Sequence, residues 1–103
     1  MGVDQKGVEL TTGGSREGFE LQQNHPNPFN TTTVIDLTLP DVVKNAVVVI
    51  HDLRGMEMKR ISVKGRGVTS VTLEANELNA GLYLYSLVAD GQLIDTKRML
   101  LMD

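Results

Sequence analysis

Two histidines are the first residues to consider for chemistry, because histidine can act as a base or bind a metal near neutral pH. His51 precedes Asp52, but neighbouring side chains of a strand point to opposite faces, so this pair cannot act on one substrate. His25 lies between Asn24 and Pro26, in a segment that we expect to be a loop. Since the chain has no cysteine, two histidines do not predict a structural metal site.

Three other patterns resemble functional motifs, but each lacks an essential part. Residues 13–18 place the second glycine one position too late for a nucleophile elbow, and no strand precedes them. Gly65-Arg66-Gly67 lacks the third glycine and the following helix of a phosphate loop. Several aspartates lack the spacing of a calcium loop, namely Asp36, Asp41, Asp90, Asp95 and Asp103. We therefore expect no enzymatic activity, no cofactor and no bound metal.

The composition limits the chain to one domain and excludes several kinds of partner. With 103 residues, of which 41% are hydrophobic, the chain can build one core. Its net charge of −3 provides no basic face for nucleic acid, and no polybasic run indicates a membrane surface. No segment approaches the roughly 20 apolar residues of a transmembrane helix. If the protein is exported, we expect the export signal on a longer parent chain.

The first 18 residues are expected to be a flexible glycine-rich linker or an added tail. Gly2, Gly7, Gly13, Gly14 and Gly18 are half of the ten glycines in the chain. Such a segment buries too little apolar surface to offset its ordering entropy. A short edge strand around residues 8–10 remains an alternative. The folded domain is expected to span residues 19–103.

A period of two, typical of β-strands, runs through this domain. Residues 32–39 alternate and place Ile35, Leu37 and Leu39 on one face. Residues 46–50 are apolar on both faces, which predicts a central strand that is buried on each side. The apolar phase changes between residues 58 and 61, which predicts a bulge near Lys59-Arg60.

The end of the chain predicts a β-hairpin. Asp90-Gly91 between two apolar runs indicates a two-residue type I′ turn. A regular register from this turn places Tyr85 opposite Thr96 and Tyr83 opposite Arg98, where a cation–π pair is expected. Both faces of the hairpin are apolar, so it should lie inside a layered structure. Together these elements predict an all-β protein, an immunoglobulin-like β-sandwich of about seven short antiparallel strands.

Folding alone offers an explanation for the most distinctive segments. The prolines in Pro26-Asn27-Pro28 fix the backbone and can steer the linker onto the sheet. Phe29 would then seal one end of the sandwich. Lys97-Arg98 on the last strand can protect an edge against aggregation.

Four ordered segments nevertheless resemble a known family. They are residues 21–33 around Pro26-Asn27-Pro28-Phe29-Asn30, residues 48–55 ending in Asp52-Leu53-Arg54-Gly55, residues 80–87 with Gly81-Leu82-Tyr83, and the closing run Thr96-Lys97-Arg98-Met99-Leu100-Leu101. They resemble the blocks of the type IX secretion system C-terminal sorting domain, type A, found in secreted and surface proteins of Bacteroidota. The resemblance covers residues 19–103.

The resemblance implies a function. A domain of this family has an immunoglobulin-like fold and directs an N-terminal cargo through the outer-membrane translocon. The implied partners are the type IX translocon, its shuttle components and a sortase-like enzyme, which removes the domain and exchanges it for a surface anchor. The protein is then expected to be secreted or held at the cell surface after passing through the periplasm.

The resemblance also assigns roles to residues. Those implied in recognition by the translocon are Gly81, Tyr83, Lys97, Arg98, Met99, Leu100 and Leu101. The family's opening motif corresponds to Pro26, Asn27, Pro28, Phe29 and Asn30, and its central turn to Asp52 and Gly55. The last strand would offer backbone groups and alternating side chains for β-augmentation.

Two alternatives to a sorting signal remain open. A binding or adhesion module would ordinarily present an aromatic platform, but Tyr83 and Tyr85 are expected on a buried strand. A dimerisation module would pair an edge strand with a second copy of the chain. The molar mass in solution would identify such a homodimer.

Overall fold

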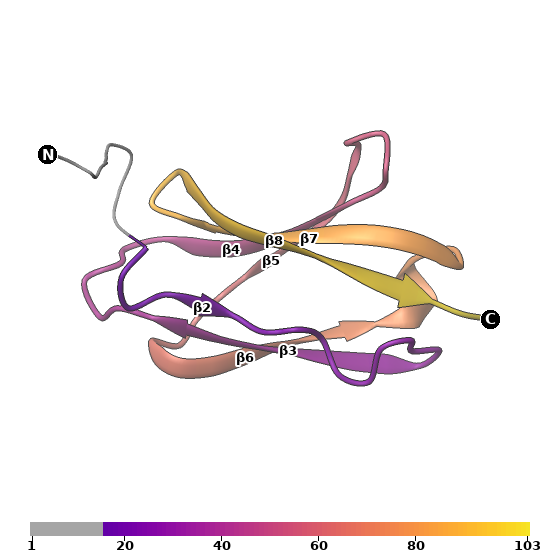
Figure 1. Cartoon of the computed structure of the whole chain (residues 1–103), viewed down its shortest axis with the longest axis horizontal. Coiled ribbons are helices and arrows are strands. Elements are labelled where there is room, and N and C mark those ends of the chain that lie inside the picture. Colours follow the sequence, from indigo (N-terminus) through magenta and orange to yellow (C-terminus); the bar gives the residue numbers. More distant parts are fainter. Residues whose placement is uncertain (1–15) are drawn as a thin grey trace, which may run out of the picture.

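Two antiparallel sheets packed face to face make up the computed structural model, which describes residues 16–103 (Figure 1). Most of the linker predicted for residues 1–18, and all of the alternative strand at residues 8–10, lie outside this range. One sheet has the order β2-β3-β6 and the other β5-β4-β7-β8. The strands are β2 (Glu20–Leu21), β3 (Thr32–Leu39), β4 (Ala46–His51), β5 (Glu57–Ser62), β6 (Gly67–Glu74), β7 (Gly81–Ala89) and β8 (Gln92–Leu101). The predicted all-β sandwich is confirmed.

Alternating side chains of both sheets fill the space between the layers. On β3, Ile35, Leu37 and Leu39 are buried as their spacing predicts. The four-stranded sheet contributes apolar groups such as Val48, Ile50, Leu87 and Met99, together with the two tyrosines of β7. Phe29 is 3% exposed and belongs to this core, so its expected role as an apolar plug is confirmed.

The outer face of the four-stranded sheet is not covered by a third layer of the described chain. β4 is a central strand, as predicted, but only Ala46, Val48 and Ile50 are buried. Val47 and Val49 on its other face are half-buried. The expected burial on both sides is therefore wrong, because each sheet of a two-layer sandwich has only one core face.

The β7–β8 hairpin begins as predicted and then changes register. Asp90 and Gly91 both have positive φ angles, 50° and 82°, as a type I′ turn requires. Ala89 pairs with Gln92 and Val88 with Leu93, but the register then shifts by one residue. Beyond this bulge Tyr85 lies opposite Lys97 and Tyr83 opposite Met99, so the predicted pairing of Tyr83 with Arg98 and its cation–π contact are wrong.

The physical reason for the bulge is the spacing of apolar residues on β8. Ile94 is buried near the turn, whereas Met99 and Leu101 are buried farther along the strand. These residues differ in phase, so a regular strand could not place all of them on one face. The extra residue in β8 brings all of them into the core. The outer face consequently carries Leu82, Leu93 and Leu100, and the prediction that both faces of the hairpin lie inside a layered structure is wrong.

The β4–β5 hairpin contains the other irregular pairing. Ile50 lies opposite Lys59 and His51 opposite Glu57, so Met58 is the extra residue. This bulge is one residue from the predicted position.

The chain enters the sandwich beside the Asp90 turn, where Glu17 and Phe19 lie close to Asp90. The chain leaves at the opposite end of the long axis, past Leu101 (Figure 1).

Shortening a buried side chain of β3 should strongly destabilise the sandwich. Leu37 is 1% exposed, so Leu37→Ala should lower the free energy of unfolding by about 2–5 kcal/mol through a core cavity. Val68 on β6 is 87% exposed, and Val68→Ala should change it by no more than about 0.5 kcal/mol. Urea unfolding of both variants tests this, and equal effects would contradict the described packing.

Candidate functional site

The opening motif lies along the outer edge of β8, where it forms hydrogen bonds with the end of the last strand. The Phe29 N–H donates to the Leu100 carbonyl (3.0 Å), and the Phe29 carbonyl accepts from the Met102 N–H (2.8 Å). The side-chain oxygen of Asn27 accepts from the Leu100 N–H (2.9 Å). The two most distinctive segments of the sequence therefore form one structural unit, in which Asn27 takes the place of a backbone carbonyl.

Gln23, which precedes the opening motif, also bonds the outer edge of β8, at the carbonyl of Arg98. The Gln23 side-chain amide donates to the Arg98 carbonyl (2.6 Å) and to the Asn24 side-chain oxygen (2.8 Å). The expectation that the last strand offers its backbone for β-augmentation is therefore wrong for the groups that bond Gln23, Asn27 and Phe29. A homodimer built on this part of β8 would have to displace the opening motif.

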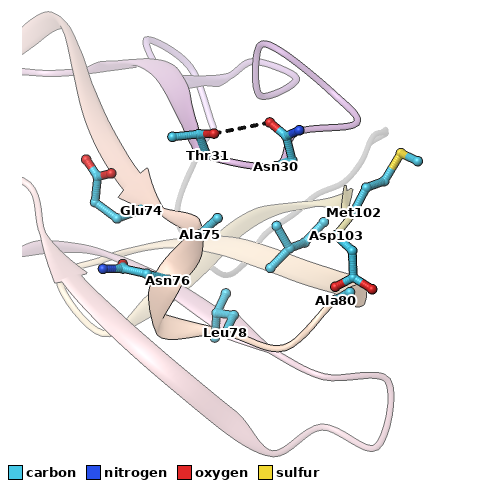
Figure 2. Close-up of a pocket in the computed structure, with 10 residues that line it drawn as sticks. Asn30, Thr31, Glu74, Ala75, Asn76, Leu78, Ala80, Met102 and Asp103 are labelled. Carbon is cyan, nitrogen blue, oxygen red and sulfur yellow. Dashed lines mark hydrogen bonds between the residues drawn. The ribbon is translucent and has the colours of Figure 1, made fainter.

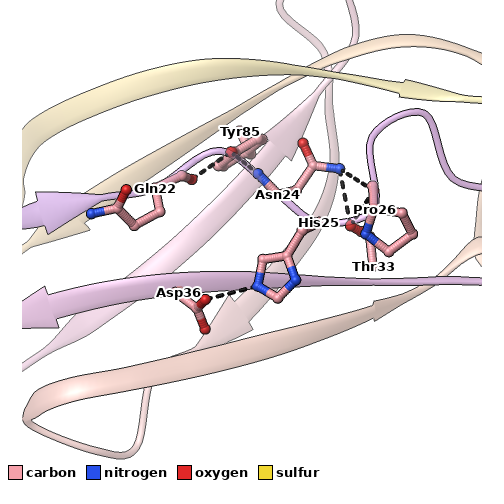
Figure 3. Close-up of polar contacts among 7 residues, drawn as sticks. All are labelled: Gln22, Asn24, His25, Pro26, Thr33, Asp36 and Tyr85. Atoms are coloured by element: carbon pink, nitrogen blue, oxygen red, sulfur yellow. Dashed lines mark hydrogen bonds and ion pairs between the residues drawn. The ribbon is translucent and has the colours of Figure 1, made fainter.

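Hydrogen bonds from buried polar side chains hold the opening motif in place (Figure 3). Asn24 is 2% exposed, and its side-chain N–H groups donate to the Pro26 carbonyl (3.1 Å) and the Thr33 hydroxyl oxygen (3.0 Å). The Thr33 hydroxyl in turn donates to the Pro26 carbonyl (2.9 Å). The His25–Pro26 and Asn27–Pro28 peptide bonds are cis. Because these polar groups satisfy one another, the motif can be packed tightly without unpaired donors.

Tyr85 of β7 connects this network to the four-stranded sheet. Its hydroxyl donates to the Gln22 carbonyl (2.7 Å) and accepts from the Asn24 N–H (2.8 Å) (Figure 3). The side chain is fully buried. Burial raises the pKa of Tyr85 to about 12, although the bond from the Asn24 N–H acts in the opposite direction.

A pocket of about 350 Å³ lies beside this unit, at the end of the sandwich where the chain leaves (Figure 2). Asn30 and Thr31 lie on one side of it, and the 3₁₀ turn Ala75–Glu77 lies on the other. The Thr31 carbonyl accepts from the Ala75 N–H (2.7 Å), which fixes the two sides relative to each other. Met102 and Asp103 also line the pocket.

The residues implied in recognition fall into two groups. Tyr83, Met99 and Leu101 are buried in the core, and the Tyr83 hydroxyl donates to the Asn79 carbonyl. Arg98 and Leu100 are exposed on the outer face, and Lys97 and Gly81 are half-buried. Of the residues implied in recognition, only the exposed and half-buried ones have accessible surface that a partner can contact. Tyr83, Met99 and Leu101 instead hold the strand that presents it.

The central turn is held by its own hydrogen bonds, and these do not involve the opening motif or the last strand. The Asp52 carboxylate accepts from the N–H groups of Arg54 (2.9 Å) and Met56 (3.0 Å), and its other oxygen pairs with the Arg54 guanidinium (2.8 Å). These bonds lower the pKa of Asp52, the side-chain bond from Arg54 most. Gly55 has φ 91°, which explains the glycine. In Figure 1 the loop between β4 and β5 projects away from the layers.

Neither histidine joins a reactive cluster. The His25 ring lies 2.7 Å from the Asp36 carboxylate, and both side chains are well exposed. Residues 16–103 contain no group of three or more histidine, aspartate or glutamate side chains placed to hold a metal. The same residues include no helix long and apolar enough to cross a membrane.

Sequence reasoning missed the residues that hold the opening motif. Thr33 could have been found, because it has the same phase as Ile35 and Leu37 on the buried face of β3. Gln23 and Asn24 carry no comparable signal, since they precede the motif in a run of polar residues. Tyr85 was expected to be buried, but its partners could not be read from its strand.

Removing the side-chain bond between the motif and β8 should loosen the last strand. Asn27→Ala should lower the free energy of unfolding by about 1 kcal/mol and speed amide exchange at Leu100. The matched control is Asn30→Ala, since Asn30 bonds Thr31 and should change stability by no more than about 0.5 kcal/mol. Unchanged exchange at Leu100 in the Asn27→Ala protein would contradict the bond.

Tyr85 should ionise far above the ordinary pKa of 10.0 for tyrosine. The fold favours the neutral phenol, so this stabilisation should be complete below pH 10 and be lost as pH rises from 10 to about 12. The ring-carbon NMR shift of Tyr85 should have its midpoint near pH 12, and Tyr85→Phe should lack this part of the alkaline decline in stability. A midpoint near pH 10 would show that the hydroxyl is not buried as described.

Comparison with known protein families finds a match for most of the chain. Residues 24–101, well over half of the chain, match a family described as a secretion system C-terminal sorting domain. The matched range contains the opening motif, the central turn and the last strand. A comparison with curated proteins finds no match. The chain therefore belongs to the family of type IX secretion system C-terminal sorting domains.

Proposed function

We propose that the folded sandwich, and not a linear stretch of its sequence, is the signal that the type IX machinery reads. As a member of its family, the chain is a C-terminal sorting signal for a secreted or cell-surface protein. The observation that supports the proposal is the pairing of Phe29 and Asn27 with Leu100. Because the first and last blocks of the family pattern touch only in the folded state, unfolding would separate them.

The surface that translocon or shuttle components contact is proposed to be the end of β8. Arg98 and Leu100 are exposed there, and Lys97 and Gly81 are partly accessible. Arginine is well suited to such a contact, because its guanidinium binds carboxylates in two places and packs on apolar groups. The domain itself is proposed to be non-catalytic.

The proposed route takes the cargo through the periplasm to the outer-membrane translocon. A sortase-like enzyme then removes the domain ahead of the sandwich and joins the cargo to a surface anchor. What supports this part is family membership. A sandwich without cysteine is suited to such a route, because it needs no oxidation to fold.

A secretion assay tests the function. A reporter fused ahead of residues 16–103 is expected at the surface or in the medium of a bacterium with an intact type IX system, and not in a translocon-null strain. Its size after release shows whether the domain has been removed. Retention of the reporter in the periplasm of both strains would overturn the sorting function.

A single substitution tests the proposed contact surface. Arg98→Ala should lower secretion of the reporter about tenfold, the effect of losing roughly 1.4 kcal/mol of binding free energy. The matched control is Arg16→Ala, which removes an exposed arginine at the other end of the sandwich. Both proteins should unfold at the same urea concentration. Normal secretion of the Arg98→Ala protein would exclude Arg98 as a contact.

A further inference from the structure

The outer face of the four-stranded sheet carries many aliphatic side chains that are exposed or half-buried. Pairing across the strands places on this face the side chains of Val47, Val49, Leu82, Leu84, Val88, Leu93 and Leu100. Leu93 is 60% exposed. No layer of residues 16–103 covers these groups.

At one end of this face lies a groove of about 570 Å³. Val47 and Val88, which are paired between β4 and β7, form its apolar floor. The cationic side chains around the groove come from Lys44, Arg60, Lys64 and Arg66. No aspartate or glutamate lines it. The groove is therefore a concentration of positive charge on a chain whose net charge is −3.

Arg66 supplies a fixed positive charge to this groove. Its guanidinium donates to the carbonyls of Val43 (2.8 Å), Lys44 (3.0 Å) and Gly65 (2.7 Å), and more distantly to that of Val63. These bonds hold the side chain in place but do not neutralise it, and no ion pair joins Arg66 to a carboxylate of the described chain. A charge held in this way loses little entropy when it binds an anion.

Lys44 and Lys64 add mobile positive charges. Both side chains are exposed, and neither forms an ion pair with a carboxylate of residues 16–103. The nearby Asp90 carboxylate instead accepts from the backbone N–H groups of Lys44 and Asn45 (3.1 and 2.8 Å). Arg60 differs, because Glu57 pairs with it at 2.8 Å. Lys44, Lys64 and Arg66 are therefore the charges available to a partner.

We propose that this groove binds an acidic peptide segment of a protein of the type IX machinery, with an aliphatic side chain over Val47 and Val88. This inference rests on the proposed function and adds a second contact surface to it. A purely polar anion would gain nothing from the apolar floor, which favours a peptide. A second copy of the chain would bring one basic rim against another, so a face-to-face dimer is disfavoured.

Peptide titration tests the groove directly. The probe is an acetylated, amidated peptide with the sequence Glu-Glu-Val-Glu-Glu, and its neutral match is Gln-Gln-Val-Gln-Gln. The acidic peptide should shift the amide NMR signals of residues 44–47, 60–66 and 88–91, and the shifts should shrink as salt is added. No shifts in these segments, or equal shifts with the neutral peptide or with inorganic phosphate, would overturn the proposal.

The same residues can be tested in secretion. The double variant Lys44→Glu/Lys64→Glu should lower release of the fused reporter about tenfold, since like charges would then face the acidic partner. Arg16→Glu is the control for charge reversal outside the groove, and an unchanged NMR spectrum away from residues 44 and 64 shows that the fold is intact. Normal secretion of the double variant beside a translocon-dependent wild type would overturn the groove and leave the sorting function standing. If secretion of the wild-type fusion did not depend on the translocon, the sorting function would be overturned. The peptide titration alone would then show whether the groove binds an acidic peptide.

Discussion

The need to cover the outer edge of the last strand is the constraint on which the structure depends. β8 spans Gln92–Leu101 at the margin of its sheet, and an uncovered strand of this length invites pairing with other chains. The opening motif meets this constraint with the backbone of Phe29 and the side chain of Asn27. A rigid segment suits this task, because its prolines restrict the backbone before it reaches the edge.

The polar network beneath the motif has a second role, which is to connect the two sheets. Tyr85 belongs to the four-stranded sheet and Thr33 to the three-stranded sheet, and Asn24 bonds both. Most of the remaining contact between the sheets is apolar and therefore carries little directional information. Hydrogen bonds have a defined geometry, so this network can set the position of the sheets relative to each other at the end that carries the family pattern.

The sequence was sufficient for features that depend on local pattern. The alternation of Ile35, Leu37 and Leu39 predicted the inner face of β3. Asp90-Gly91 correctly predicted the turn between β7 and β8. The register beyond that turn was wrong, although the change in phase from Ile94 to Met99 could have revealed the bulge. The contact between Asn27 and Leu100 could not have been derived, because it joins residues 73 apart and replaces a backbone bond with a side chain.

The same limit applies to the candidate sites. Resemblance identified the opening and closing motifs, but only the fold shows that Tyr83, Met99 and Leu101 are internal while Arg98 is accessible. The basic groove was not predicted, since Lys44, Arg60, Lys64 and Arg66 are scattered in sequence and converge through the pairing of β4 with β5. Aliphatic residues on both faces of β4 and β7 predict burial on both sides, whereas the structure buries one face and leaves most of the other only half-buried.

The chain enters the sandwich beside the Asp90 turn and leaves it past Leu101, at the opposite end of the long axis. β8 runs between these two points, and a strand of 10 residues measures roughly 33 Å at about 3.3 Å per residue. The domain can thus act as a spacer between its cargo and a partner that binds the proposed contact surface at the end of β8. A bulky passenger and a bulky receptor would not collide across this distance, so one grip could serve passengers of very different size and shape.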